Sequence, residues 1–147
     1  MPFANDRARS LWARTRVRVW PDRYVLASLA PSLTGAAMAL LGQQPAPGFT
    51  AVVLERDEVS VTLPEVVWAS SQLPRRAEAG PFRVVTLDLD LDLDVCGFLA
   101  PAAAALAAAG IPIVPQCAFL KDHLLVPEAH LEAAVRVLEG LSAEAKG

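Results

Sequence analysis

The sequence has few of the residues and motifs from which most catalytic sites are built. It contains two histidines and two cysteines in 147 residues. Glycine-rich phosphate loops, the HExxH zinc motif and the GxSxG nucleophile motif are all missing. His123 and His130 are seven residues apart, with no serine or cysteine partner evident in the sequence. We therefore expect no catalytic residue and no enzymatic activity, and a structural role for His123.

The cysteines lack the spacing of a metal site. Cys96 and Cys117 lie in apolar segments, outside any CxxC pair and away from any histidine cluster. We expect two buried free thiols, and neither a bound metal nor another cofactor.

Long apolar runs are also missing. The longest, around residues 95–109, is rich in alanine and contains Gly97 and Pro101. It is shorter than the roughly 18 residues that a membrane-spanning helix needs. The first residues mix arginine with Asp6 and lack the apolar core of a secretory signal. These absences predict a cytoplasmic protein without a membrane partner.

Charged residues are few and unevenly distributed. They make up 20% of the chain, against 54% apolar residues, as in an ordinary globular domain. Residues 1–87 carry 10 Lys or Arg against 7 Asp or Glu, whereas residues 88–147 carry 3 against 9. Six arginines between Arg7 and Arg23 form the basic stretch, with few aromatic residues among them. We therefore expect no nucleic-acid partner, and a basic start that faces the acidic end within the fold.

The first half shows two hairpin patterns around a helix pattern. Residues 15–20 alternate between polar and apolar, which predicts a strand with one face exposed to solvent. The expected elements are strands at 15–20, 24–29, 49–54 and 58–63, a short helix from Ser32 or Thr34 to Gly42, a loop at 43–48 and helical turns at 65–71. The polar segment 73–81 is the expected boundary between the halves.

The second half predicts an α+β fold. Leu131, Ala134 and Leu138 recur at helical spacing, which indicates a final helix with one buried face. The expected elements are a strand at 82–87, a helix at 97–109, strands at 111–118 and 122–126, and a helix from Pro127 onwards. This order is typical of helices on one face of an antiparallel sheet.

The run Asp88-Leu-Asp90-Leu-Asp92-Leu-Asp94 would place four carboxylates on one side of a continued strand. An EF-hand starting at Asp88 would need glycine at its sixth and glutamate at its twelfth position, and both are leucine. The DxDx[TV] motif of haloacid-dehalogenase-type phosphatases is also incomplete, because its last position is aspartate. A cation site at Asp90, Asp92 and Asp94 is an alternative to a solvated acidic face, which we favour.

Two motifs resemble those of ACT domains. Asp94-Val-Cys-Gly-Phe-Leu-Ala100, followed by a helix and Gly110-Ile-Pro-Ile113, is similar to the D-x-x-G-apolar-L-A loop, helix and G-I-x-I strand of that family. Phe119-Leu-Lys-Asp-His-Leu-Leu-Val126 is similar to a signature of the ACT subgroup that includes CASTOR-type arginine sensors and short bacterial proteins. The resemblance covers residues 82–141, and the first half only in outline.

The resemblance implies a non-catalytic regulatory module that binds a free amino acid at an interface between ACT units. Backbone N–H groups at the start of the helix would hold the ligand's carboxylate, and Gly97 would allow it to approach closely. Asp94 or Asp122 would accept its ammonium group. The alternatives are that Asp94 is one more solvated acid and that Asp122 is a turn residue at the start of a strand. The implied ligand-binding residues are Asp94, Val95, Cys96, Gly97, Phe98, Leu99, Gly110, Ile111, Phe119 and Asp122.

The resemblance also implies ferredoxin-like ACT units in tandem. We expect a degenerate N-terminal unit at 12–72 and a C-terminal unit at 80–141, interlocked because the second unit borrows strand 15–20. By analogy with other ACT proteins we expect a homodimer that completes the ligand site. The alternative is a module that recruits a protein or nucleic acid and has no small ligand.

Overall fold

The computed structural model describes residues 2–44 and 48–147, so part of the predicted loop at 43–48 lies outside the described residues. The chain divides into two units. The discontinuous unit consists of the residues up to Trp20 together with Arg83–Gly147, and the inserted unit is Pro21–Phe82. Strand β5 (Ala77–Asp88) contributes its first residues to the inserted unit and its last to the discontinuous unit.

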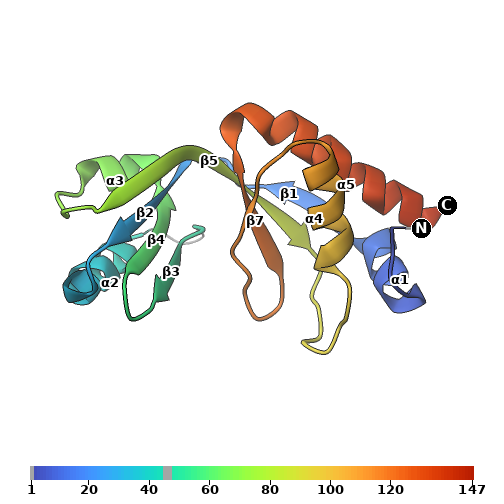
Figure 1. Ribbon diagram of the computed structural model, residues 1–147, viewed down its shortest axis with the longest axis horizontal. Coiled ribbons are helices and arrows are strands. Elements are labelled where there is room, and N and C mark those ends of the chain that lie inside the picture. The colour runs from blue at the N-terminus through green and yellow to red at the C-terminus, as the bar shows by residue number, and fades with distance from the viewer. Residues whose placement is uncertain (1, 45–47) are drawn as a thin grey trace. The chain divides into compact units, whose positions relative to one another are not determined.

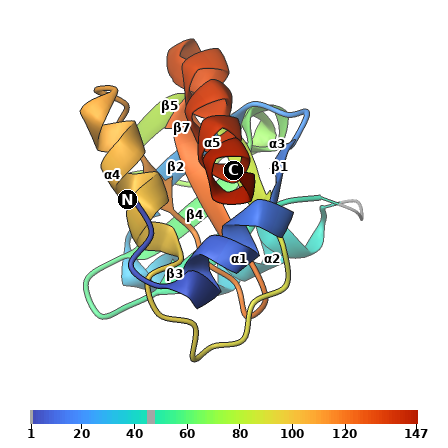
Figure 2. The same cartoon turned by 90° about the vertical axis from the view of Figure 1, so that its right-hand side faces the viewer.

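The discontinuous unit packs three helices on a sheet of order β1-β5-β7-β6. Buried side chains of α1, α4 and α5 meet Val85 and Leu87 of β5 and Leu124 and Val126 of β7, which are alternate residues of each strand. Figure 2 shows α1 beside the C-terminal part of α5. Its elements are α1 (Asp6–Arg14), β1 (Arg16–Val19), α4 (Leu99–Ala108), β6 (Val114–Pro115), β7 (Asp122–Pro127), the 3-10 turn η2 (Glu128–His130) and α5 (Leu131–Lys146).

The inserted unit has the strand order β3-β4-β2-β5, with antiparallel pairing throughout (Figure 1). Its core includes Leu29, Val61, Leu63 and the indole of Trp68. The elements are β2 (Tyr24–Leu29), the 3-10 turn η1 (Pro31–Leu33), α2 (Thr34–Gly42), β3 (Ala51–Leu54), β4 (Val59–Pro64) and α3 (Glu65–Ser70).

The predicted α+β fold with an antiparallel sheet and packed helices is confirmed. The final helix buries Ala134 and Leu138 as its periodicity predicted. No helix within residues 2–44 and 48–147 is long and apolar enough to cross a membrane.

Helix α1 was missed in the sequence. Its residues are mostly polar and charged, so the mean hydropathy is low, although Ala8, Leu11 and Trp12 form one apolar face. Ala8 and Trp12 are nevertheless fully buried at i, i+4 spacing, and Asn5 caps the helix by accepting a hydrogen bond from the N–H of Ala8 at 2.8 Å. Tertiary packing of one indole and an N-cap therefore define a helix that hydropathy does not show.

Several predicted elements were wrong in their bounds. The strand at 111–118 shortens to Val114–Pro115, because prolines lack the N–H that a sheet requires and the Ile111 N–H bonds to Leu106 O instead. The segment 73–81 is strand from Ala77 onwards, since residues 77–79 pair with β2. Strand β5 ends at Asp88, so the four carboxylates of the acidic run do not share one strand face.

Candidate functional site

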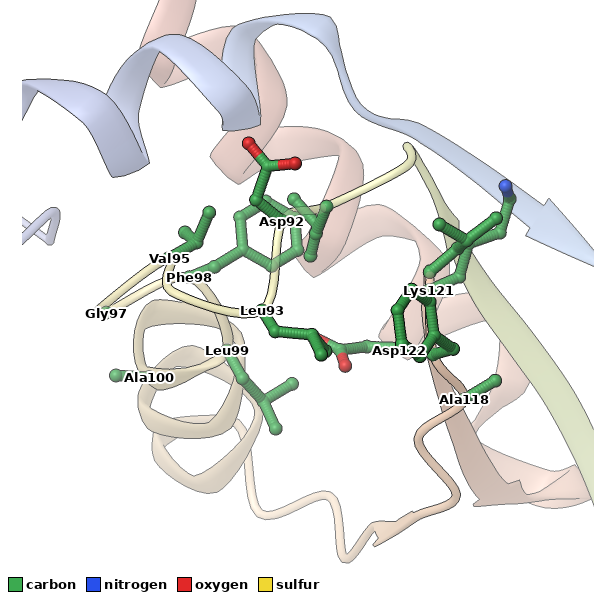
Figure 3. A pocket seen from close by; sticks show the side chains of 13 residues that line it. Asp92, Leu93, Val95, Gly97, Phe98, Leu99, Ala100, Ala118, Lys121 and Asp122 are labelled. Atoms are coloured by element: carbon green, nitrogen blue, oxygen red, sulfur yellow. The ribbon is translucent and has the colours of Figure 1, made fainter.

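A pocket of about 320 Å³ opens in the discontinuous unit between two loops. One loop leads from β5 into α4, and the other is the tip of the β6–β7 hairpin. Figure 3 shows apolar side chains of both loops around the cavity, with the Asp122 carboxylate among them and Asp92 turned away. The lining consists of Leu91, Asp92, Leu93, Val95, Gly97, Phe98, Leu99, Ala100, Ala118, Phe119, Leu120, Lys121 and Asp122. We call this cavity the loop pocket.

Helix α1 and its N-cap hold the first loop in place through the side chains of Asn5 and Trp12. Asn5 donates from Nδ2 to the Cys96 carbonyl at 3.1 Å, and the Trp12 indole donates to the Phe98 carbonyl at 2.7 Å. The Trp12 and Phe98 rings stack with centroids 5.0 Å apart. Both rings are buried, so these contacts fix the backbone at the point where α4 begins.

Arg7 binds the acidic run from the same end of α1. Its guanidinium donates to Asp94 Oδ1 at 3.0 Å and to Asp92 Oδ2 at 3.3 Å. The hydrogen bond and charge of Arg7 hold the pKa of Asp94 below its usual value. Arg18 pairs with Asp88 at 2.7 Å. The expectation that basic residues near the start face the acidic second half is confirmed for these two arginines.

The hairpin tip forms the second wall of the loop pocket. The Ala118 N–H bonds to the Lys121 carbonyl at 2.9 Å and closes the turn, and the Leu91 N–H bonds to the Leu120 carbonyl at 2.8 Å. The second bond joins the two loops directly. Lys121 also pairs with Asp90, so backbone and side-chain contacts both connect the walls.

Asp92 and Lys121 also line the loop pocket, but they pair with Arg7 and Asp90, and two further groups give it polar character. Helix α4 begins at Leu99 after Phe98, whose side chain offers no capping bond, so the first N–H groups of the helix carry its partial positive charge. The Asp122 carboxylate supplies the negative charge. The site therefore presents a donor group and an acceptor group within an apolar surround.

Both cysteines are free but exposed, so the prediction that they are buried was wrong. They lie on the two loops, which are solvated on their outer sides, and not on the strands that form the core. Burial of its thiol and the neighbouring Asp122 carboxylate raise the pKa of Cys117 to about 11. Cys117 therefore remains a neutral thiol at physiological pH.

A hydrogen-bonded chain runs through the sheet beside Asp122. The Trp20 indole donates to Thr86 Oγ1 at 2.9 Å, and Thr86 Oγ1 lies 2.7 Å from His123 Nδ1. The threonine oxygen accepts from Trp20, and the tautomer of the imidazole decides whether Thr86 Oγ1 donates to Nδ1 or accepts from it. Burial lowers the pKa of His123. This chain was not evident in the sequence, because its members are 37 and 66 residues apart.

The structure brings together six of the ten residues that the resemblance implied. The loop pocket is lined by Val95, Gly97, Phe98, Leu99, Phe119 and Asp122. Asp94 is occupied by Arg7, and Cys96 is exposed on the loop outside the lining. Gly110 and Ile111 lie beyond the opposite end of α4, where Ile111 enters the core.

Gly97 has a structural reason to be glycine. Its φ is +81°, and a Cβ atom there would lie 3.0 Å from Ala4 Cβ. A larger side chain would therefore strain the backbone and push against the segment before α1. Substitution of Gly97 tests the fold of the loop as much as access to the pocket.

Three large apolar side chains on the rim of the loop pocket are open to solvent. Leu93 is 73% exposed, Phe119 is 74% exposed and Leu120 is 47% exposed. The described residues contain no group of three or more His, Cys, Asp or Glu side chains able to hold a metal ion. The site is thus a mostly apolar pocket with the α4 N-terminus and three charged side chains, of which Asp92 and Lys121 pair with residues outside the lining.

Comparison with known proteins relates this arrangement to a family. Residues 80–140 match the family model of the ACT domain. A search of the curated proteins found no match.

Solved structures share the fold over most of the chain. A protein of unknown function from Vibrio cholerae, described as a possible transport protein, is 21% identical with a TM-score of 0.70, over 91% of this chain and 94% of that one. A protein from Agrobacterium tumefaciens is 21% identical with a TM-score of 0.67, over 88% and 90%. The regulatory subunit of aspartate kinase from Thermus flavus is 14% identical with a TM-score of 0.57, over 85% and 95%. Residues 80–140 are thus similar to the ACT domain, and the whole chain shares its fold with these solved structures.

Proposed function

We propose that the protein is a regulatory module that catalyses no reaction and binds a free amino acid in the loop pocket. The observation that carries this proposal is the placement of the α4 N-terminus and the Asp122 carboxylate on one pocket. Their charges complement the carboxylate and ammonium groups of an amino acid. ACT domains are regulatory modules that bind amino acids, and a regulatory subunit of aspartate kinase has this fold.

Asp122 is the proposed acceptor for the ligand's ammonium group. It lines the loop pocket, whereas both oxygens of Asp94 already bind Arg7. A ligand ammonium at Asp94 would have to displace a guanidinium, and one at Asp122 would not displace that ion pair. This difference supports Asp122 over Asp94, which the sequence left open.

We further propose that a second copy of the chain completes the site. The exposed Leu93, Phe119 and Leu120 surround the pocket with apolar surface that a partner would bury. Gly110 and Ile111 line no part of this pocket. In the proposed homodimer the exposed Gly110 would approach it from the second copy, whereas Ile111 is buried in the core.

The remaining parts of the proposal concern organisation. Residues 12–72 and 80–141 would be tandem ACT-like units, and the pairing of Val17 with Leu87 supports a strand lent to the second unit. Two exposed free cysteines are typical of a reducing compartment, which supports a cytoplasmic location. Membership of the subgroup with CASTOR-type sensors is also part of this proposal.

The direct test is a thermal-shift screen of the twenty amino acids. At about 100 times its dissociation constant, a ligand specific for the folded protein adds about 2.7 kcal/mol to the free energy of unfolding. For a chain of this size the melting temperature should rise by roughly 5–10 °C. Asp122→Asn should abolish the rise while keeping the shape of the side chain.

Asp88→Asn is the matched control, because Asp88 pairs with Arg18 and does not line the loop pocket. It should keep the response to the amino acid. Sedimentation velocity should show a dimer. If no amino acid raises the melting temperature, or if Asp122→Asn responds like the parent, the binding function is wrong. Salt-dependent binding of a protein or nucleic acid would then favour the pure interaction module.

A further inference from the structure

The inserted unit contains a second cavity, of about 390 Å³, that the proposed function does not use. It lies between α3 and the first part of β5, which run side by side in Figure 1. Its size is within the range of about 300–1,000 Å³ that is usual for small-ligand sites. The lining consists of Val25, Glu65, Trp68, Ala69, Arg75, Glu78, Ala79, Gly80 and Pro81. We call it the tryptophan pocket.

Trp68 and Glu78 form a fixed corner of this pocket. The Trp68 side chain is nearly buried, and its indole N–H donates to Glu78 Oε2 at 2.5 Å. The bond holds the carboxylate at the edge of the ring, because the indole N–H lies in the ring plane. This bond and the neighbouring Arg75 lower the pKa of Glu78, so its negative charge is kept at neutral pH. An aromatic face beside a fixed carboxylate is a binding site for a planar cation.

A guanidinium of the chain itself occupies this corner. Arg75 Cζ lies 4.2 Å from the centroid of the Trp68 ring, and one of its nitrogens donates to Glu78 Oε2 at 2.8 Å. The guanidinium thus stacks on the indole and pairs with the carboxylate at the same time. The position of Arg75 shows which ligand chemistry the corner accepts.

The hold on Arg75 is weak enough for exchange. Its side chain is 32% exposed and that of Glu78 is 46% exposed, so water screens the ion pair. Arg75 follows Pro74 in the segment before β5, and no regular element fixes its backbone. A cation that enters the pocket can therefore take the place of Arg75 without disturbing the core.

The lining also favours a positively charged ligand. Glu65 and Glu78 contribute two carboxylates, and Arg75 is the single cationic side chain of the lining. Once Arg75 swings out, two negative groups and an indole face remain. An anionic ligand would meet repulsion, and a neutral ligand would leave the Glu78 charge unpaired.

We propose that the tryptophan pocket binds a ligand that carries a guanidinium group, with Arg75 as an internal competitor that must leave first. The guanidinium stacks on Trp68 and bonds to Glu78, as Arg75 does in the free protein. Only molecules whose Arg75 has left the pocket can bind the ligand. The apparent affinity is therefore the intrinsic affinity multiplied by the fraction of such molecules. The site lies in the inserted unit and is independent of the loop pocket.

The test uses agmatine as a free guanidinium compound and Nα-acetylarginine amide as a mimic of arginine in a peptide. Each is titrated into ¹⁵N-labelled protein while the indole N–H resonance of Trp68, assigned with Trp68→Phe, is followed. Arg75→Ala should tighten binding of the better probe by about fivefold, because exposed ion pairs and cation–π contacts are individually weak. Arg75→Lys should tighten it less, since an ammonium still competes.

The matched control is Arg76→Ala. Arg76 is the neighbouring arginine, donates to the Asp57 carbonyl and does not line the pocket. It should leave the affinity unchanged. Glu78→Gln should weaken binding at least tenfold, although its amide oxygen can still accept from Trp68.

The outcomes separate the ligand sources. Tighter binding of agmatine supports a free small molecule, and tighter binding of the amide supports an arginine within a peptide. The proposal is overturned if Arg75→Ala binds no more tightly than the parent. It is equally overturned if Nα-acetylcitrulline amide, which has the same shape but no charge, binds as well as the arginine compound. Asp122→Asn should leave this titration unchanged, because Asp122 does not line the tryptophan pocket. A failure of the proposed function at the loop pocket can therefore be told apart from a failure of this proposal.

Discussion

The contact between Trp12 and Phe98 gives a quantitative prediction, because it links a helix missed in the sequence to the start of α4. Trp12→Phe keeps an aromatic ring for stacking but removes the indole N–H that bonds the Phe98 carbonyl at 2.7 Å. Loss of that bond costs about 0.5–1.5 kcal/mol. The smaller ring also leaves a cavity at a fully buried position, which adds about 1–2 kcal/mol. We therefore expect the free energy of unfolding to fall by about 1.5–3.5 kcal/mol.

Urea unfolding followed by circular dichroism would measure this change from the midpoint, provided that the slope stays the same. Arg7→Ala is the comparison, because Arg7 also joins α1 to the loop but its side chain is half exposed. That variant should change stability little, and less still at high salt. A loss below about 0.5 kcal/mol in Trp12→Phe would refute the conclusion that the buried indole, and not the surface ion pair, fastens the loop.

Two further predictions concern titration. Burial lowers the pKa of His123 below 6.5, so the unfolded chain binds the proton more readily, and the stability that the neutral ring provides above pH 6.5 should be lost as the pH falls. The urea midpoint between pH 7.5 and 5 should therefore depend less on pH in His123→Gln than in the parent. Equal pH dependence in the two proteins would contradict this. A pKa raised from 9.0 to about 11 makes the thiolate fraction of Cys117 about 100-fold smaller at pH 8, so iodoacetamide should modify it slowly, and faster in Asp122→Asn. Mass spectrometry of the Cys117 peptide would measure both rates, and rapid alkylation of the parent would show that the thiol is not so perturbed.

The sequence predicted those parts of the molecule in which local chemistry and tertiary structure agree. The helix stop at Gly110 and the buried face of α5 follow from local rules, and both are present. The two motif segments were recognised through their apolar and glycine positions, and the structure places them on opposite walls of one pocket. The resemblance, and not the spacing, suggested that these distant segments lie together, and their role in binding stays a prediction.

The parts that were missed depend on distant partners. Helix α1 has a local N-cap and a local apolar face, but the loop against which Trp12 packs lies 86 residues later, outside any local window. The exposed state of Cys117 follows from a hairpin that projects outward, although the segment itself is apolar. The same holds for Asp94, whose neutralisation by Arg7 requires contact across 87 residues. In each case an interaction between distant segments outweighed local composition.

The discontinuous unit also constrains the order of events when the chain is made. Its first strand and helix leave the ribosome early, but the strand pairs with residues 85–88 and the helix packs on α5, near the end of the chain. The inserted unit, whose contacts are internal to residues 21–82, can form while its flanking segments are still waiting for their partners. During that interval Trp12 and Val17 have no core to enter, so a nascent chain exposes apolar surface that the finished protein hides. Slow or paused synthesis after residue 82 would therefore be the period in which a chaperone is most useful.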